Sequence, residues 1–107
     1  MKLINKHINK LKILCKKHKV VELYVFGSIL TDSFSQDSDI DFLVRFSGVD
    51  IIDYFDNYMD FMEALEKLYE HDIDLIEIQT VKNPILKRSI DRNKVKIYGR
   101  IDSKMAV

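Results

Sequence analysis

Two aspartates, Asp39 and Asp41, open the alternating run DIDFLVRF, and this run constrains the fold more than any other feature. Its even-numbered positions are all apolar, namely Ile40, Phe42, Val44 and Phe46. Because successive side chains of a strand point to opposite faces, the run predicts a strand over 39–46 with one buried face. The two aspartates share the other face, where their carboxylates repel each other unless a cation lies between them.

A Gly-Ser pair, Gly27 and Ser28, precedes the first of these acids by ten intervening residues. Residues 20–26, VVELYVF, are mostly β-branched or aromatic and predict a short buried strand that ends at this glycine. Glycine permits a tight turn and a close approach of phosphate to backbone N–H groups. Ser28 alone would usually be a turn residue, but the acids that follow favour a phosphate site.

A third acid, Asp74, lies within a second alternating run, DIDLIEI, which predicts a strand over 72–78. If the two alternating strands are neighbours, Asp39, Asp41 and Asp74 form one cluster. Mg²⁺ prefers oxygen ligands, so this cluster could hold one or two ions and support phosphoryl transfer. The alternative for two acids alone is a strand edge kept soluble by charge. The Gly-Ser pair and the third acid favour the metal site.

The remaining patterns predict three helices and one more strand. Apolar residues recur at helical spacing over 2–18 and 51–69, Asn83 and Pro84 are signals for a helix to about residue 93, and 95–98 could form a short strand. This order predicts an α/β (α+β) fold in which helices pack on a small mixed sheet. We expect a single domain over 1–107, with its core at about 20–99 and a frayed tail over 100–107.

The composition excludes several classes of protein. The chain has 107 residues and no net charge, and no apolar run approaches the length that spans a membrane. The single cysteine cannot form an internal disulfide. The three histidines are isolated in the sequence, so they do not indicate a zinc site, and we expect them on the surface. Residues 1–19 hold seven lysines and no acid, a pattern more typical of a solvated helix face than of nucleic-acid binding. We expect a cytoplasmic protein.

The order Gly-Ser, ten residues and Asp-Ile-Asp resembles the signature of the DNA polymerase β-type nucleotidyltransferase superfamily. The FGS start, the SDIDFLV run, the later DLIE strand, and KNP followed by a helix and IYG are most similar to its minimal branch, the MNT proteins, over roughly residues 20–99. The resemblance implies the nucleotidyltransferase fold. It also implies that triphosphate binds at Gly27 and Ser28, and that the catalytic, Mg²⁺-binding carboxylates are Asp39, Asp41 and Asp74.

The identity of the third acid has an alternative in Asp72, which lies on the same face of the predicted strand as Asp74. Asp74 is favoured, because the apolar residues Ile73 and Leu75 flank it as in the family pattern.

The chain departs from the family pattern directly after the Gly-Ser pair. Many relatives carry an arginine within three residues of that pair, whereas this chain continues with Ile-Leu-Thr-Asp. A phosphate-binding cation is either missing or comes from elsewhere. The candidates, by position alone, are Lys87, Arg88 and Arg92 in the last predicted helix.

The resemblance implies transfer of a nucleotide, AMP from ATP, to an acceptor hydroxyl. It also implies a toxin–antitoxin partner, because MNT proteins are often encoded with a HEPN-domain toxin, which they AMPylate or bind. The alternative is a non-catalytic module that neutralises its partner by contact alone. Aromatic and apolar residues cover an unusually wide surface of the 51–69 helix, so we expect this helix to contact a HEPN partner or a second copy of the chain.

Overall fold

The computed structural model describes residues 1–99 as four helices and four strands joined by short turns. The helices are α1 (Lys2–Lys6), α2 (Ile8–Lys17), α3 (Tyr54–Tyr69) and α4 (Pro84–Asn93), and the strands are β1 (Val20–Phe26), β2 (Ile40–Phe46), β3 (Ile73–Glu77) and β4 (Val95–Gly99). The tail that we expected to fray, 100–107, lies outside the described residues. Within residues 1–99, no helix is long and apolar enough to cross a membrane.

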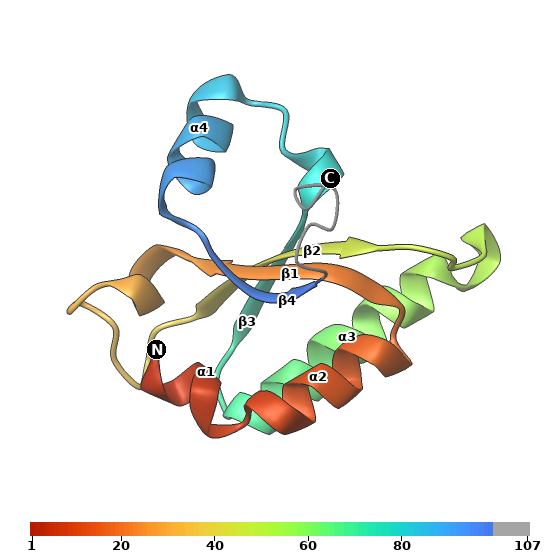
Figure 1. Cartoon of the computed structure of the whole chain (residues 1–107), viewed down its shortest axis with the longest axis horizontal. Helices are drawn as coiled ribbons and strands as arrows, with labels where there is room; N and C mark the ends of the chain where they lie inside the picture. The colour runs from red at the N-terminus through yellow and green to blue at the C-terminus, as the bar shows by residue number, and fades with distance from the viewer. Residues whose placement is uncertain (100–107) are drawn as a thin grey trace, which may run out of the picture.

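The four strands form one mixed sheet in the order β3-β2-β1-β4. β1 is antiparallel to β2 and β4, whereas β2 and β3 are parallel. Parallel neighbours need a crossover connection, which α3 supplies. In Figure 1, α1, α2 and α3 lie on one side of the sheet and α4 stands on the other. The predicted mixed α/β architecture is therefore confirmed.

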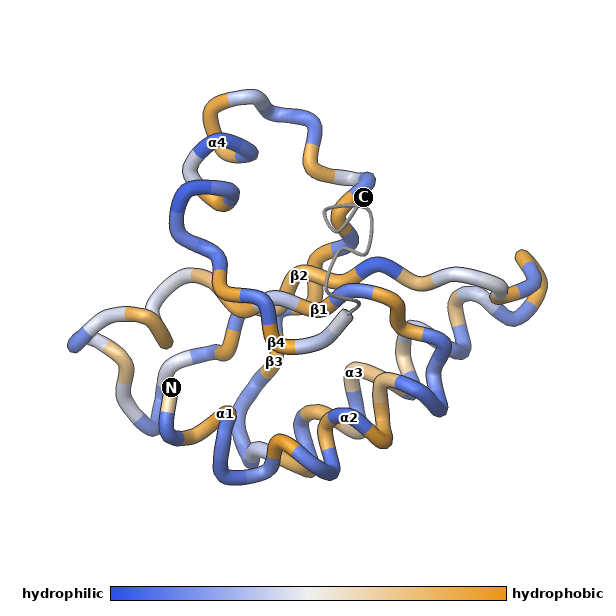
Figure 2. Tube along the Cα trace, viewed as in Figure 1, coloured by the Kyte–Doolittle hydropathy of each residue, from blue (hydrophilic) through white to orange (hydrophobic). Residues whose placement is uncertain are grey.

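The core lies between the sheet and the pair α2 and α3. Along β2, Phe42 and Val44 are fully buried, whereas Asp41 and Arg45 on the other face are half-exposed. Hydrophobic and hydrophilic residues also alternate along α2 and α3, as the orange and blue segments in Figure 2 show. The largest fully buried side chains are Phe42, Phe61, Ile4, Leu11, Leu23, Ile40 and Leu65. Burial of each of these side chains stabilises the fold by roughly 1.5–3 kcal/mol. Because the core lies on the side of α2 and α3, the polar side chains Asp41 and Arg45 can lie on the opposite face of the sheet.

The single N-terminal helix expected over 2–18 is divided into α1 and α2 at His7, whose φ of −120° and ψ of 26° are not helical. The break is supported by tertiary contacts with the end of α3. The Tyr69 hydroxyl donates a hydrogen bond of 3.1 Å to the carbonyl of Ile4, and its ring packs edge-on against His7. These long-range contacts could not be predicted from the helical spacing of the apolar residues.

The wide apolar surface predicted for the 51–69 helix is buried along most of its length. Phe61, Leu65 and Tyr69 belong to the core, and Tyr54 and Tyr58 are half-buried. The exposed part is confined to the beginning of the segment. There Ile51, Ile52 and Phe55 are 90%, 88% and 69% exposed, and we call these three residues the apolar tip.

The histidines differ from the expectation of three surface side chains. His18 is buried: its Nδ1 lies 2.9 Å from the carbonyl oxygen of Leu14, and its ring packs on Phe61. His7 and His71 are half-buried. The expectation was wrong for His18 because a ring that satisfies its nitrogen within its own helix can enter the core.

Candidate active site

Asp41 and Asp74 lie side by side on the sheet face that α2 and α3 leave uncovered. The parallel register of β2 and β3 pairs Asp41 with Asp74, and it pairs Ile40 with Ile73 on the buried side. Side chains at paired positions of neighbouring strands point to the same face. Asp74 is exposed and Asp41 half-exposed, so both carboxylates are accessible from solvent.

The environment of Asp41 disfavours its charged form. Burial is the main cause, and the negative charges of Asp74 and Asp39, with a hydrogen bond to Asp74, act in the same direction. Together they raise the pKa of Asp41 to about 6. Two carboxylates in such contact must share a proton or bind a cation, and their oxygens are the ligands that Mg²⁺ prefers.

Asp39 lies one residue before β2 and is exposed. Its position is fixed through the next residue, because the Ile40 N–H donates a hydrogen bond of 3.0 Å to the carbonyl of Asp72. Asp39 is near enough to raise the pKa of Asp41. Within residues 1–99, however, no three acidic, histidine or cysteine side chains are already arranged as a complete metal site. The predicted three-carboxylate site is thus represented by the pair Asp41 and Asp74, with Asp39 beside it.

Gly27 is required at the end of β1 for a reason that the sequence did not reveal. Phe26 pairs with Asp41 across the antiparallel strands, and Gly27 follows with a φ of +77°. A Cβ at this position would collide with the carboxylate oxygen Oδ2 of Asp41. Glycine therefore makes room for the Asp41 carboxylate, and it also adopts a backbone conformation that other residues rarely take.

Ser28 begins the short 3-10 turn Gly27–Leu30 and is half-buried beside the acids. The turn is closed at its end, where the backbone N–H and the hydroxyl of Thr31 both donate hydrogen bonds to the Ser28 carbonyl, at 2.9 and 2.8 Å. Gly27 and Ser28 thus lie next to Asp41, as a phosphate site beside a metal site would require.

The loop between the Gly-Ser turn and β2 is held by His71, a residue that we expected only on the surface. Its ring stacks on Phe34 at 5.2 Å, and its Nδ1 donates a hydrogen bond of 2.8 Å to the carbonyl of Ser38. His71 therefore positions the backbone directly before Asp39. No local pattern could have indicated this role, because the contact spans 33 residues of chain.

Asp72, the alternative third acid, lies one residue before β3. Its carbonyl accepts a hydrogen bond from the backbone of β2, and the residue lines a hollow together with Ser38, Glu66 and Glu70. Asp74, and not Asp72, pairs with Asp41 in the sheet register. The geometry therefore favours Asp74 as the third carboxylate.

The three basic candidates on α4 differ in direction. Arg88 and Arg92 lie two residues before and after the buried Ile90, which at 3.6 residues per turn places both on the side of the helix turned away from the sheet. Lys87 lies on the sheet side, but it forms an ion pair of 3.0 Å with Asp91. None of the three is a direct substitute for a basic residue beside Gly27 and Ser28.

Comparison with known proteins agrees with this geometry. Residues 9–103 match the family described as polymerase beta, nucleotidyltransferase. Two proteins of Methanocaldococcus jannaschii, both provisionally named protein adenylyltransferases, are 34% and 33% identical over 84 residues, which cover 78% of this chain and 83% of each relative.

Solved structures show the same fold. A structure provisionally described as a minimal nucleotidyltransferase is 26% identical, with a TM-score of 0.69, over 89% of this chain and 95% of that one. A toxin–antitoxin crystal structure with AMP-PNP has a TM-score of 0.67 at 20% identity, over 92% and 78% of the two chains. An MNT antitoxin bound to a tri-AMPylated HEPN toxin of Shewanella oneidensis has a TM-score of 0.63 at 19% identity, over 95% and 77%. The chain described here belongs to the polymerase β nucleotidyltransferase family.

Proposed function

We propose that this nucleotidyltransferase transfers AMP from ATP to a hydroxyl group of a HEPN-type toxin and thereby acts as its antitoxin. The observation that carries the proposal is the contact between Asp41 and Asp74 beside Gly27, because it joins a cation site to a phosphate site on an open sheet face. The names of the relatives, protein adenylyltransferase, support the choice of AMP. The solved complex of an MNT antitoxin with an AMPylated HEPN toxin supports the choice of acceptor.

In this proposal, Asp39, Asp41 and Asp74 hold one or two Mg²⁺ ions through carboxylate oxygens, which fits a donor set made only of oxygen. Bound Mg²⁺ would supply charge stabilisation for the reacting phosphate. Gly27 and Ser28 bind the outer phosphates through backbone N–H groups and the hydroxyl. Asp74, which is more exposed than Asp41, faces the incoming hydroxyl and helps remove its proton. A bond then forms between that oxygen and the α-phosphorus, and pyrophosphate leaves.

The partner would meet the chain at the apolar tip, Ile51, Ile52 and Phe55. Large apolar side chains exposed by 69–90% are typical of surfaces that another protein covers. A second copy of this chain is the alternative occupant. Nucleic-acid binding through the lysines of residues 1–19 stays the less favoured interpretation of that segment, and a cytoplasmic location stays a prediction from the sequence.

The competing function is neutralisation by contact without transfer. The observation in its favour is that none of the three residues after Ser28 is basic, because a triphosphate site without a neighbouring cation would bind its substrate weakly. Both functions use the same fold, so they differ only in whether the acids are needed.

The deciding experiment is incubation of the chain with a co-encoded HEPN protein, Mg²⁺ and ATP labelled on its α-phosphate. We expect label to appear on the partner and intact-mass analysis to show added AMP. Asp41→Asn should abolish labelling, and Asp37→Asn, which changes an exposed acid in the adjacent loop, should not. Equal labelling by the parent and Asp41→Asn would exclude a catalytic role for these carboxylates.

A further inference from the structure

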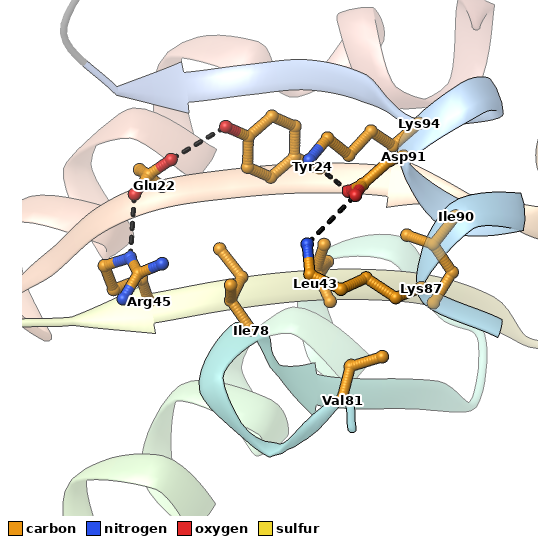
Figure 3. A pocket seen from close by; sticks show the side chains of 10 residues that line it. All are labelled: Glu22, Tyr24, Leu43, Arg45, Ile78, Val81, Lys87, Ile90, Asp91 and Lys94. Carbon is orange, nitrogen blue, oxygen red and sulfur yellow. Dashed lines mark hydrogen bonds and ion pairs between the residues drawn. The ribbon is translucent and has the colours of Figure 1, made fainter. Parts of the chain in front are cut away.

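A small cavity lies between the sheet and α4 (Figure 3). Its volume is about 170 Å³. The apolar part of its lining comes from three separate segments: Leu43 from β2, Ile78 and Val81 from the turn after β3, and Ile90 from α4. The cavity is therefore a product of the tertiary fold, and no single stretch of sequence indicates it.

The cavity adjoins the candidate active site along β2. Leu43 follows Asp41 by two residues, so the two side chains share a sheet face and are separated by roughly 7 Å. The register places Tyr24 opposite Leu43 and Phe26 opposite Asp41. On β1, too, two residues therefore separate the position beside the cavity from the position beside the acids. A ligand with its phosphate at the acids could reach the cavity through a group about as long as one pleat of the sheet.

The charges at the cavity indicate which kind of ligand it suits. Its three basic residues are all paired: Arg45 with Glu22 at 2.8 Å, and Lys87 and Lys94 with Asp91 at 3.0 and 2.8 Å. The net charge of this lining is therefore close to balanced, which is unlike a site for a bare phosphate. An uncharged ligand with an apolar body fits this lining better.

The far end of the cavity offers hydrogen-bonding groups at a fixed position. The Tyr24 hydroxyl donates a hydrogen bond of 2.7 Å to Oε1 of Glu22, and the Nε of Arg45 donates to Oε2 of the same carboxylate. The Lys94 ammonium lies 4.5 Å from the centre of the Tyr24 ring. Beside the apolar side chains of the lining, this group of acceptor and donors suits the polar edge of a heteroaromatic ring.

We propose that this cavity binds the nucleobase of the nucleoside triphosphate, with Leu43, Val81 and Ile90 against the ring and Glu22 and Arg45 at its polar edge. The inference rests on the proposed function, because it assumes that the phosphates lie at Gly27 and Ser28. It adds that α4 is part of the nucleotide site, and that affinity for ATP exceeds affinity for its phosphates alone.

The test compares two ligands, each with Mg²⁺: α,β-methylene ATP, which cannot transfer AMP, and inorganic tripolyphosphate. Isothermal titration of the parent chain should show tighter binding of the nucleotide by at least about tenfold, equivalent to about 1.4 kcal/mol. Val81→Trp fills the cavity and should reduce nucleotide affinity to that of tripolyphosphate, while tripolyphosphate binding stays unchanged. Ile85→Trp, at a position 78% exposed on α4, is the matched control and should bind both ligands like the parent.

A second measurement needs no variant. In the parent, NMR signals of the methyl groups of Leu43, Val81 and Ile90 should shift with the nucleotide and not with tripolyphosphate. Three results would each overturn the nucleobase site while leaving the phosphate site intact. They are equal affinities of the parent for the two ligands, an unchanged nucleotide affinity of folded Val81→Trp, and methyl signals that do not respond to the nucleotide. If the parent binds neither ligand, the proposed function fails and the base site fails with it.

Discussion

At the scale of single residues, Asp41 links stability to the candidate site. Its pKa of about 6 exceeds the usual 3.8, so the folded protein binds this proton more tightly than the unfolded chain does. The resulting stability is complete below about pH 4 and is lost as the pH rises through 6. We expect Asp41→Asn to raise the free energy of unfolding of the metal-free protein at pH 8 by about 1 kcal/mol, a value reduced for solvent exposure.

Urea denaturation of the parent and Asp41→Asn at pH 5 and pH 8, in EDTA, measures this effect. The difference between the two proteins should be larger at pH 8, and Asp37→Asn should show no such gain. Added Mg²⁺ should stabilise the parent and have little effect on Asp41→Asn. A parent that is more stable than Asp41→Asn at pH 8 without metal would contradict the inferred repulsion.

Gly27 and Gly48 provide a matched pair for a second prediction, because their φ angles are +77° and +79°. A Cβ at Gly48 would meet no atom within 4 Å, whereas a Cβ at Gly27 would collide with Asp41. We expect Gly48→Ala to lose about 1 kcal/mol through backbone strain alone. Gly27→Ala should lose clearly more in the same denaturation experiment and should also weaken binding of Mg²⁺. Equal losses would show that the Asp41 carboxylate can move aside without cost.

The sequence could indicate the acids and the Gly-Ser pair as candidates, because the pattern lies in short spacings, and their roles stay predictions. Asp74 was favoured over Asp72, and the sheet register agrees with that choice. The contributions of His71 and of the cavity residues could not be predicted in this way. His71 acts through a ring contact with Phe34, and Leu43 and Ile90 meet only when the chain has folded.

At the scale of elements, α4 buries the smallest share of its residues among the four described helices. Only Ile90 of its ten residues is buried. Its start is fixed by Asn83, whose side chain accepts hydrogen bonds from the N–H groups of Ile85 and Leu86 at 2.9 and 3.3 Å, as the Asn-Pro signal predicted. A helix with so little burial depends strongly on its cap.

We therefore expect Asn83→Ala to destabilise α4 by about 1 kcal/mol while the rest of the fold is unchanged. Hydrogen exchange should accelerate over residues 84–93 but not in β1 or β2. Asn93→Ala, at the other end of the same helix, is the control, because Asn93 only donates to the Ser89 carbonyl. Equal acceleration in α4 and the central strands would show that α4 unfolds together with the whole domain.

Element types were predictable because periodicity reports directly on burial, as the strands over 39–46 and 72–78 show. Boundaries were less so. The break at His7 depends on contacts with α3, which lie outside the segment. The residues Ile51–Asp53, which we expected as the start of the long helix, form a separate 3-10 turn. The position of α4 over the acid-bearing face was also beyond the sequence, since only one of its side chains, Ile90, is buried.

At the scale of the whole molecule, the two candidate functional regions are separate. The acid pair and the cavity lie on the sheet face beneath α4, whereas the apolar tip lies at the beginning of α3 and is flanked in sequence by the exposed acids Asp50, Asp53 and Asp56. An apolar surface with an acidic border suits a partner with an apolar pocket and basic margins. Catalysis and docking can therefore be removed independently.

The last prediction uses this separation. Ile51→Ser removes a tip residue that is 90% exposed, and Ile13→Ser makes the same change at another exposed position, on α2, which is 66% exposed. Neither change should lower the free energy of unfolding, because little buried area is lost. We expect Ile51→Ser to weaken partner binding by at least about tenfold in a pull-down titration, since buried apolar anchors dominate interface energies. Ile13→Ser should bind like the parent.

The same partner then distinguishes transfer from contact. The double variant Asp39→Asn with Asp41→Asn keeps the tip, so it should still bind the HEPN protein but fail to neutralise it when ATP and Mg²⁺ are present. Ile51→Ser keeps the acids and should neutralise only at higher concentration, because transfer needs an encounter and not a lasting complex. If neutralisation survives loss of both acids and fails with Ile51→Ser, the chain acts by contact and the transferase proposal is wrong. If Ile51→Ser and Ile13→Ser both bind like the parent, the partner docks elsewhere, and the acid-bearing face beneath α4 becomes the surface to test.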